Sequence, residues 1–599
     1  MVRASFAGFS TALSALQANQ KRLDIVGQNL SNMNTVGYTR QQLNTSSINY
    51  RTPVSNYMNG AEVIVGFGVH MDGVSQIRDP YLDAQYRSQM YKAGYTDSLQ
   101  TSLDSLAKIF DESQIDNLRA GFDDIMASLI DMQDGPKVND AIYESELRAK
   151  MKALANMLNT ADTKITEAEQ QEYMKLSGKN TSENGSIEIV NDMLMQIGKL
   201  NRQIKQNQIL GQPSLELMDE RNVLLDELSS YIPIEVTYYK DQAHDGIDAN
   251  GDSTSKEALG EVYHLDSSGN PMFKKEWPDD LRVEMLYTDA NGVTQRLTLI
   301  EGTEGTGDDN YGKLELTGGS LANPAEAAIT FHGSKANLTT NPGGPVVFEK
   351  NGSTISNQFP EDSGSIQSTL DMLWKDGKTT GIDDKRGYEY YRSELDQLAR
   401  VFAGVMNAIN IDGAKNDDTV ADKTAQFLFY NKETGQPGGI TAANIGINSE
   451  WVNGNVHVST AGSNALGTHN PNDTILNMLE AMGATFGKPG AVTKNLDTIL
   501  KAEGFTDYDL RDNSFADFMN HTSTVLANDS YHNTMAMKTN VTVLNGIQNS
   551  RDEVSGISLD EEASNMMQFM SAYNAASRLM TTLDQTLDTL INSTGVVGR

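Results

Sequence analysis

The feature that most constrains the fold is a heptad spacing of apolar residues at both ends of the chain. When Phe6 is placed at position a, large apolar side chains occupy a and d positions at Phe6, Phe9, Leu13, Leu16, Leu23 and Leu30. Near the other end, a heptad that starts at Leu559 collects Leu559, Met566, Phe569, Tyr573, Met580, Leu583, Leu587 and Leu590. This spacing predicts one amphipathic helix at each end, with a narrow apolar seam of the kind that coiled coils bury.

Neither terminal helix can bury such a stripe alone, and isolated helices of this length are only marginally stable in water. Two arrangements satisfy the pattern. Each helix could lie on a globular core, or the two helices could pair with each other and with neighbouring copies. Because polar residues fill most positions outside the seam, we favour pairing. Ser558, with Glu561 three residues later, forms a capping box that predicts where the second helix starts.

The sequence NLSNMNTVGYTRQ, residues 29–41, interrupts the first heptad pattern. Short polar side chains compete with helical hydrogen bonds and tolerate left-handed backbone, so we expect the helix to end here. Gly37 offers a position where positive φ costs little, and Tyr38 carries a large ring that can dock the returning chain. The residues of this signature turn are Asn29, Asn32, Asn34, Thr35, Gly37 and Tyr38.

Between the ends, apolar spacing of about 3.6 residues alternates with segments rich in Gly, Asp, Asn, Ser and Thr. Helices are expected from Asp79 through Phe110, over about 140–175, 186–208 and 215–230, near 363, over 388–410, and from 472 and 514. Another is expected to carry Leu118, Phe122, Ile125 and Leu129 and to stop at DGP, residues 134–136. Short β-like runs occupy about 233–360. Two of them, RVEMLYT and RLTLIEG, flank DANG at 289–292, which predicts a hairpin turn.

These observations predict a multidomain α+β protein of elongated shape, with both termini at one tip. It would have terminal coiled-coil-like helices, a helical-bundle shaft and an inserted β-rich domain. The expected segments are an N-terminal helix and extended turn over 1–62, which pairs with 550–599, shaft parts over 63–232 and 361–549, the β-rich insertion over 233–360, a small β insertion at about 425–465, and a C-terminal helix over 550–599.

The composition of the chain disfavours several classes of binding partner. A formal charge of −33 disfavours nucleic acid and anionic lipid as partners, because both would repel the chain. The chain has no Cys, so disulfides and thiolate chemistry are excluded. No apolar run approaches the length of a membrane span. The first 18 residues resemble a signal peptide only loosely, since Ser and Thr interrupt the apolar stretch, and we expect a retained helix.

The sequence contains only weak motifs for a metal, phosphate or catalytic site. GIDANGDSTSKE, residues 246–257, nearly fits a calcium loop, but Gly246 stands at its first ligand position and Ser253 where an apolar residue normally anchors it. The eight His residues form no HExxH motif or close pair, and no phosphate-binding Gly-Lys-Ser/Thr loop is present. Choosing two carboxylates as acid and base would be arbitrary. We therefore expect no enzyme, no cofactor and no metal.

The segment LDIVGQNLSNMNTVGYTRQ resembles the N-terminal signature of axial proteins of the bacterial flagellum, namely rod, hook and hook-associated proteins. GYTRQ most resembles the hook-associated protein 1 family, although Val36 stands where that family usually has Pro. Further segments resemble the family in the same order, namely VGFGVHMDGVSQIRDPYLDAQYRSQ, LMDERNVLLDELS, YYRSELDQLARVFAGVMNAINIDG and the C-terminal SGISLDEEASNMMQFMSAYNAASRLMTTLDQTLDTLINSTG. Together they cover about half of the chain.

The resemblance implies a structural protein that joins hook to filament by self-assembly through its terminal helices. Its implied partners are further copies in a ring-like joint, the hook protein, the second junction protein and a cytoplasmic export chaperone on the C-terminal helix. It implies type III export, without a cleaved signal peptide, to the flagellum outside the cell. Alternatives are the hook protein or the second junction protein, against which GYTRQ and SGISLDEE argue, and a secreted protein whose 233–360 insertion is enzymatic or adhesive.

Overall fold

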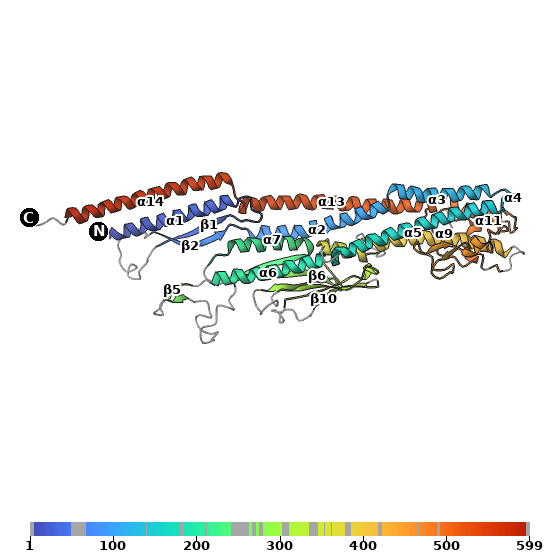
Figure 1. The fold of residues 1–599 in the computed structure, drawn as a ribbon, viewed down its shortest axis with the longest axis horizontal. Helices are drawn as coiled ribbons and strands as arrows, with labels where there is room; N and C mark the ends of the chain where they lie inside the picture. Colours follow the sequence, from blue (N-terminus) through green and yellow to red (C-terminus); the bar gives the residue numbers. More distant parts are fainter. Residues whose placement is uncertain are drawn as a thin grey trace, which may run out of the picture.

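The structure, a computed structural model, describes residues 5–48, 68–138, 140–179, 184–209, 212–240, 263–265, 271–274, 279–301, 311–334, 345–352, 354–360, 362–377, 385–416, 422–423, 425–464, 466–487 and 492–594. It is a multidomain α+β protein in which helices predominate. Figure 1 shows the long helices lying along the longest axis of the molecule, with the two chain ends at the same end of the picture.

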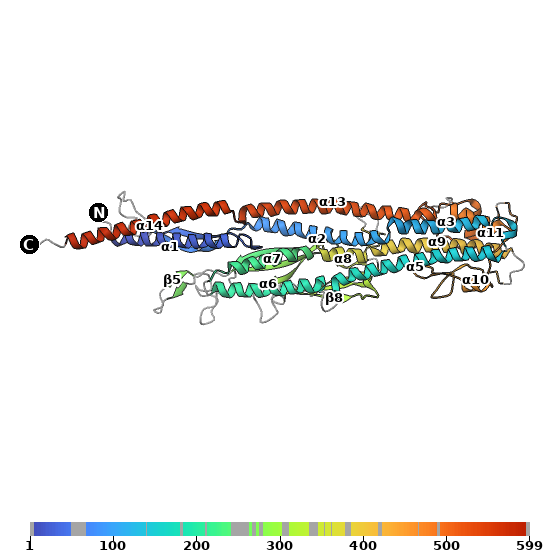
Figure 2. The same cartoon turned by 45° about the horizontal axis from the view of Figure 1, so that its top comes forward.

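Two antiparallel helix pairs follow one another along that axis. Helix α1 (Ser5–Ser31) lies beside α14 (Leu559–Thr594), and α2 (Pro80–Ile109) lies beside α13 (Phe515–Ser555) in both Figures 1 and 2. Between α1 and α2 the chain forms an antiparallel ribbon of β1 (Gln41–Ser47) and β2 (Val69–Gln76). The backbone departs from helix only at residues 556–558 between α13 and α14. The terminal pair therefore continues the line of the second pair.

The remaining helices form the shaft and its far end. They are α3 (Glu112–Asp131), α4 (Gly135–Val138), α5 (Ala141–Ser177), α6 (Ser186–Ile209), α7 (Leu215–Tyr231), α8 (Ser365–Trp374), α9 (Tyr388–Lys415), α10 (Ser449–Asn453), α11 (Asp473–Gly483) and α12 (Lys494–Ala502). Most begin where the apolar spacing predicts. The side chain of Asp79 accepts a hydrogen bond from the Tyr81 amide, with Pro80 in the first turn, as the sequence indicates.

The strands of the middle region form antiparallel sheets. The strands are β3 (Ile234–Lys240), β4 (Tyr263–Leu265), β5 (Pro271–Lys274), β6 (Asp279–Asp289), β7 (Thr294–Glu301), β8 (Lys313–Gly318), β9 (Ala328–His332), β10 (Val346–Phe348), β11 (Lys350–Asn351), β12 (Thr354–Ile355) and β13 (Asn357–Gln358), followed later by the pair β14 (Phe429–Asn431) and β15 (Ile445–Ile447). A turn with Gly292 at φ 78° joins β6 to β7, which confirms the expected hairpin.

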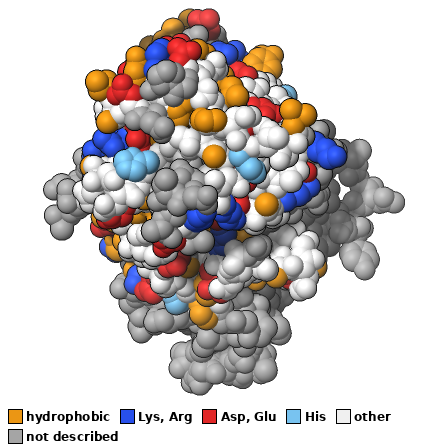
Figure 3. All heavy atoms as spheres, turned by 90° about the vertical axis from the view of Figure 1, so that its right-hand side faces the viewer, with side chains coloured by type: hydrophobic (Ala, Val, Ile, Leu, Met, Phe, Trp, Pro, Cys, Tyr) orange, Lys and Arg blue, Asp and Glu red, His pale blue; other side chains and the backbone are white. Residues whose placement is uncertain are grey.

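Two hydrophobic cores hold the shaft. One lies among α3, α5, α9, α11 and the start of α13, and its centre is a cluster of aromatic rings around Phe402. The other joins β6 to β10 with α6, α7 and α8, so the strands after residue 233 share their core with these helices. The hydrophobic side chains on the far end of the molecule, seen in Figure 3, lie scattered among charged and polar ones. Burial is therefore concentrated inside the shaft.

Candidate assembly site

The two ends of the chain meet as an antiparallel helix pair. A Cβ at Gly8 would lie 3.2 Å from Leu583 Cδ2, and the Arg22 guanidinium lies 5.4 Å from the centre of the Phe569 ring. In both facing pairs the two residue numbers have the same sum, as antiparallel helices in one register require. Because Gly8 has no side chain, Leu583 can approach the backbone of α1.

Along α14 the covered side chains follow the predicted seam. Glu562 and Ala576 are buried, and most of the expected apolar positions are half-buried, namely Met566, Phe569, Tyr573, Met580, Leu583 and Leu587. Leu559 is exposed at the start of the helix, and Leu590 lies in its last turn. Since α14 packs against one helix only, α1, just a narrow stripe of its side chains is covered in the single chain.

Along α1 the covered face differs from the expected seam. The buried residues are Ala12, Ala18, Asn19, Ile25, Val26 and Asn29. Phe9, Leu16 and Leu23 are half-buried, whereas Leu13 and Leu30 are 49% and 36% exposed, and Phe6 lies in the first turn. The seam expected at positions a and d is therefore displaced by about one residue.

The β1–β2 ribbon explains this displacement. The Val69 amide donates to Ser14 Oγ at 3.2 Å, and Arg22 donates to Thr45 Oγ1 at 3.0 Å. Helix α1 thus packs against the ribbon as well as α14, and its covered face turns to lie between these two partners. The sequence pattern predicted only an extended turn here and did not reveal the ribbon.

Asn29 holds the signature turn together. Its side-chain oxygen accepts hydrogen bonds from the Gln41 amide at 3.0 Å and the Tyr38 hydroxyl at 3.1 Å. Its amide group donates to the Gln41 carbonyl at 3.1 Å. Burial, followed by the charges of Glu216, Asp219 and Glu562, raises the pKa of Tyr38 to about 12. Tyr38 therefore keeps the proton that it donates.

The rest of the turn is local and tight. The Thr35 amide donates to the Asn32 carbonyl at 2.9 Å, and the Thr35 hydroxyl to Asn32 Oδ1 at 3.3 Å, while Asn34 is exposed. Gly37 has φ +79°, which confirms the positive φ expected from the sequence. A Cβ at Gly37 would also lie 2.2 Å from Val223 Cγ2. Glycine is thus required both by the backbone and by contact with α7.

The turn docks on α7 through residues that the sequence pattern did not select. Thr39 donates its amide and hydroxyl to the Asp219 carboxylate, at 3.1 and 2.6 Å. Burial raises the pKa of Asp219, although the hydrogen bonds from Thr39 and the charge of Arg78 oppose this. Thr39 lies in GYTRQ and Asp219 in LMDERN, two segments that carry the family resemblance. This resemblance was the one sequence feature that pointed to them.

Three arginines and two further aspartates tie the same junction together. Arg551 near the end of α13 pairs with Asp83 at 3.1 Å and with Asp226 at 2.8 Å. Arg78 pairs with Asp83 at 2.5 Å, and Arg87 with Asp226 at 2.8 Å. Burial alone lowers the pKa of Arg78, but the hydrogen bond and charge of Asp83 outweigh it, so the net pKa is raised. Arg78 therefore keeps its positive charge at neutral pH.

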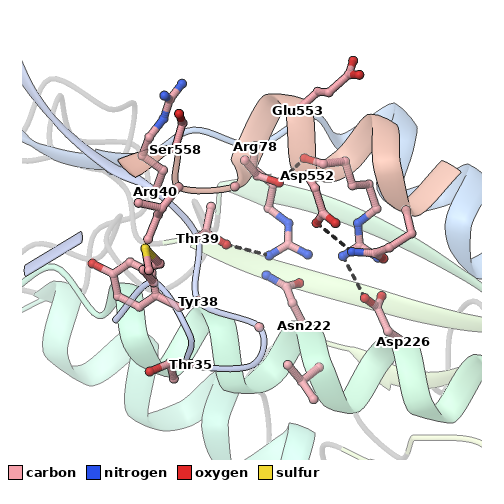
Figure 4. A pocket seen from close by; sticks show the side chains of 18 of the residues that line it. Thr35, Tyr38, Thr39, Arg40, Arg78, Asn222, Asp226, Asp552, Glu553 and Ser558 are labelled. Carbon is pink, nitrogen blue, oxygen red and sulfur yellow. Dashed lines mark hydrogen bonds and ion pairs between the residues drawn. The ribbon is translucent and has the colours of Figure 1, made fainter. Parts of the chain in front are cut away.

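A cleft of about 600 Å³ opens beside this network, between the turn, α7 and the break between α13 and α14 (Figure 4). Arg40 crosses the break. Its amide donates to the Ser555 carbonyl at 2.9 Å, and its guanidinium pairs with Glu561 at 2.6 Å. Arg40, two residues after the signature turn, thus contacts both helices on either side of residues 556–558.

The described residues offer little for catalysis. They contain no group of three or more His, Asp or Glu side chains placed to hold a metal ion. Ser102 Oγ accepts from Lys175 at 2.8 Å and donates to Glu172 at 2.7 Å, an arrangement that could activate a hydroxyl, but Ser102 is 1% exposed. The near-calcium loop at 246–257 lies outside the described residues. Among the described helices, none is long and apolar enough for a bilayer span.

Three family models match parts of the chain. The model described as "Flagellar hook-associated protein FlgK helical domain" matches residues 103–323. The one described as "Flagella basal body rod protein" matches residues 9–39, and "Flagellar basal body rod FlgEFG protein C-terminal" matches 548–593. The rod-protein matches therefore cover the helices and the turn of the assembly site.

Curated relatives match over nearly the whole length. Flagellar hook-associated protein 1 of Bacillus subtilis is 28% identical, covering 99% of this chain and 99% of that protein. Its counterparts in Salmonella typhimurium and Escherichia coli are 23% and 22% identical, covering 97% of this chain and 98% and 99% of theirs. The solved structure of the flagellar hook junction protein FlgK from Burkholderia pseudomallei aligns with a TM-score of 0.35 and 15% identity, over 60% of this chain and 46% of that one.

Proposed function

This chain belongs to the flagellar hook-associated protein 1 family, and we propose that it is a structural axial protein that joins the hook to the filament. The antiparallel pairing of the two chain ends carries the proposal. Both ends also match models of rod proteins, while the middle matches a hook-associated helical domain. The shared ends would supply a common way of stacking axial subunits, and the middle would distinguish this subunit from the others.

The proposed mechanism is self-assembly without chemistry. Terminal helices would dock onto the preceding hook subunits and accept the subunits that follow, forming a coiled-coil-like layer around the export channel. Burial of one Leu or Phe in such a layer contributes about 1.5–3 kcal/mol. Several half-buried side chains on α14, among them Phe569, Tyr573 and Leu583, have area left to bury. The shaft and its β-rich insertion would complete an elongated subunit along the five segments expected from the sequence.

The proposed partners follow from this position. They are further copies of the chain in a ring-like joint, the hook protein on one side, the second junction protein on the other, and an export chaperone that holds the C-terminal helix before assembly. Met567 and Met570 on α14 are 67% and 57% exposed, which suits a helix that exchanges partners. We propose export to the flagellum without a cleaved signal peptide, because α1 takes part in the folded terminal pair.

Immunogold labelling of intact cells tests the proposal. The expected result is a label concentrated at the boundary between hook and filament. Label along the whole hook would favour the hook protein, and label spread over the cell surface would favour an adhesive or enzymatic secreted protein. Either distribution would contradict the proposed position.

A further inference from the structure

A second cleft, separate from that in Figure 4 but sharing Arg40 with it, lies where α14 begins. It measures about 610 Å³ and is lined by the end of α1, the strand β1 and the first turns of α14, including Asn29, Asn565 and Phe569. This volume equals that of about twenty water molecules. The terminal pair thus contains a cleft large enough to receive several side chains.

Glu562 lines this cleft, and one of its carboxylate oxygens has no hydrogen-bond donor in the described chain. The residue is 2% exposed, and its Oε2 atom is buried and accepts no hydrogen bond from the described chain. A buried carboxylate oxygen that lacks a donor is energetically costly. Rotation about the Cγ–Cδ bond exchanges the two oxygens, so a donor that enters the cleft can supply the missing hydrogen bond.

Arg40 lines the same cleft with an unmatched donor. Its guanidinium pairs with Glu561 through Nη1, but Nε is buried and has no acceptor within the described chain. The cleft therefore presents both an unpaired acceptor and an unpaired donor. A carboxamide side chain can donate through its NH₂ group and accept through its oxygen, so it matches both.

The exposed face of α1 carries such groups at helical spacing. This face, defined by Leu13, Gln17, Gln20, Asp24 and Gln28, points away from the chain's own α14. Gln17 and Gln20 form no side-chain hydrogen bond in the described structure, and Leu13 beside them is 49% exposed. It includes the row of a positions, Leu13 and Gln20, that the single chain leaves uncovered.

We infer that this cleft receives the exposed face of α1 from a second copy of the chain, with a glutamine carboxamide on Glu562 and Arg40. The inference rests on the proposed function as an assembling subunit. Because this face of α1 is turned away from the chain's own cleft, one molecule cannot satisfy itself. Each copy would present the face at one side and the cleft at the other, which is the head-to-tail arrangement that rings require.

Paired cysteines test this contact in the full chain, which contains no Cys of its own. Leu13→Cys, which keeps every glutamine of the exposed face, is combined with Asn565→Cys, which lies in the cleft, or with Gln568→Cys, an exposed control three residues away on the same helix. Flagella are isolated, treated with a mild oxidant and analysed without reductant. We expect about tenfold more disulfide-linked dimer from the cleft pair, because disulfides need Cα atoms within about 7 Å.

The outcomes separate the inference from the proposed function. Flagella that lack the chain altogether would contradict the proposed function. Flagella that contain it but give equal or no dimer from the cleft pair would overturn only the inference. A cross-linked band with the mass of another flagellar subunit would also overturn it, since the occupant would then not be a second copy.

Glu562→Leu provides an independent readout. Removal of the unpaired carboxylate should leave the melting temperature of the soluble chain unchanged or higher, while incorporation into flagella falls about tenfold, as expected for one lost hydrogen bond to a charged group. Asp560→Leu, which removes an exposed carboxylate in the same turn, is the control. Loss of melting temperature in Glu562→Leu, or unchanged incorporation, would overturn the inference.

Discussion

Helices α9 and α14 are both long and amphipathic, yet one is almost enclosed and the other is largely open. Most side chains of α9 are buried, with Phe402 at 0% exposure among three other aromatic rings. On α14 the buried side chains of the described residues are only Glu562 and Ala576. An enclosed helix finds its partners within its own chain. The open one has a single partner, and this difference separates the residues that fold the chain from those that we propose to act in assembly.

The largest effect is expected from truncating the centre of the enclosed region. Phe402→Ala should cost about 3–5 kcal/mol of unfolding free energy, since it leaves a cavity between Phe122, Phe429 and Phe515. Phe569→Ala on α14 should cost only about 1 kcal/mol, because that ring is half-buried and loses mainly its contact with Arg22. Denaturant titration of both variants measures the gap. Equal losses would break the comparison.

The next effect concerns the junction between the two regions. Arg551→Met removes a guanidinium that pairs with Asp83 and Asp226, and should cost about 2 kcal/mol, because each aspartate keeps a second arginine. Arg578→Met, at an exposed position on α14, is the control and should stay within about 0.5 kcal/mol. If Arg551→Met is equally silent, the network does not join the regions.

Gly37 tests whether the turn belongs to the junction or is a free connector. Gly37→Ala should cost about 1–3 kcal/mol, from positive φ together with the collision with Val223. Gly73 also has positive φ, +147°, but no atom lies within 4 Å of a Cβ placed there. Gly73→Ala therefore measures the cost of backbone strain without a collision. In the Val223→Ala background the cost of Gly37→Ala should shrink. Identical costs in both backgrounds would mean that the turn does not press on α7.

Part of this fold could be predicted from the sequence alone. Periodicity placed the starts of α2, α9, α13 and α14 to within a few residues, because each begins a continuous apolar stripe. It also located the hairpin at Asp289, since that turn type needs a glycine at positive φ.

The covered face of α1 was harder to predict. Its rotation depends on the β1–β2 ribbon, whose strands QQLNTSS and VHMDGVSQ are polar and carry no strong alternation. The contacts Thr39–Asp219 and Arg551–Asp83 join residues 180 and 468 positions apart, respectively. No local pattern contains such pairs. The family resemblance selected the right segments, but not the residues within them that meet.

A smaller effect is expected from pH. Burial raises the pKa of Asp219 above its usual value, so the folded chain binds this proton at a pH where the unfolded chain has lost it. The free energy of unfolding should therefore fall as pH rises from about 4 through the raised pKa, by about 1.4 kcal/mol for each pH unit between the unfolded and folded pKa values. Asp219→Asn should lack this fall. A constant difference between the two proteins from pH 4 to 7 would contradict the assigned direction.

The central claim is that the terminal pair serves assembly more than folding, and Leu583→Asp tests it most directly. Leu583 is half-buried against Gly8, so the soluble chain should lose less than about 1 kcal/mol and keep its melting profile. In the assembled flagellum the same carboxylate would be buried without a partner, at a cost of several kcal/mol. Cells that carry the variant should build hooks but release filament protein into the medium. Normal filaments on these cells, or early melting of the soluble chain, would contradict the claim.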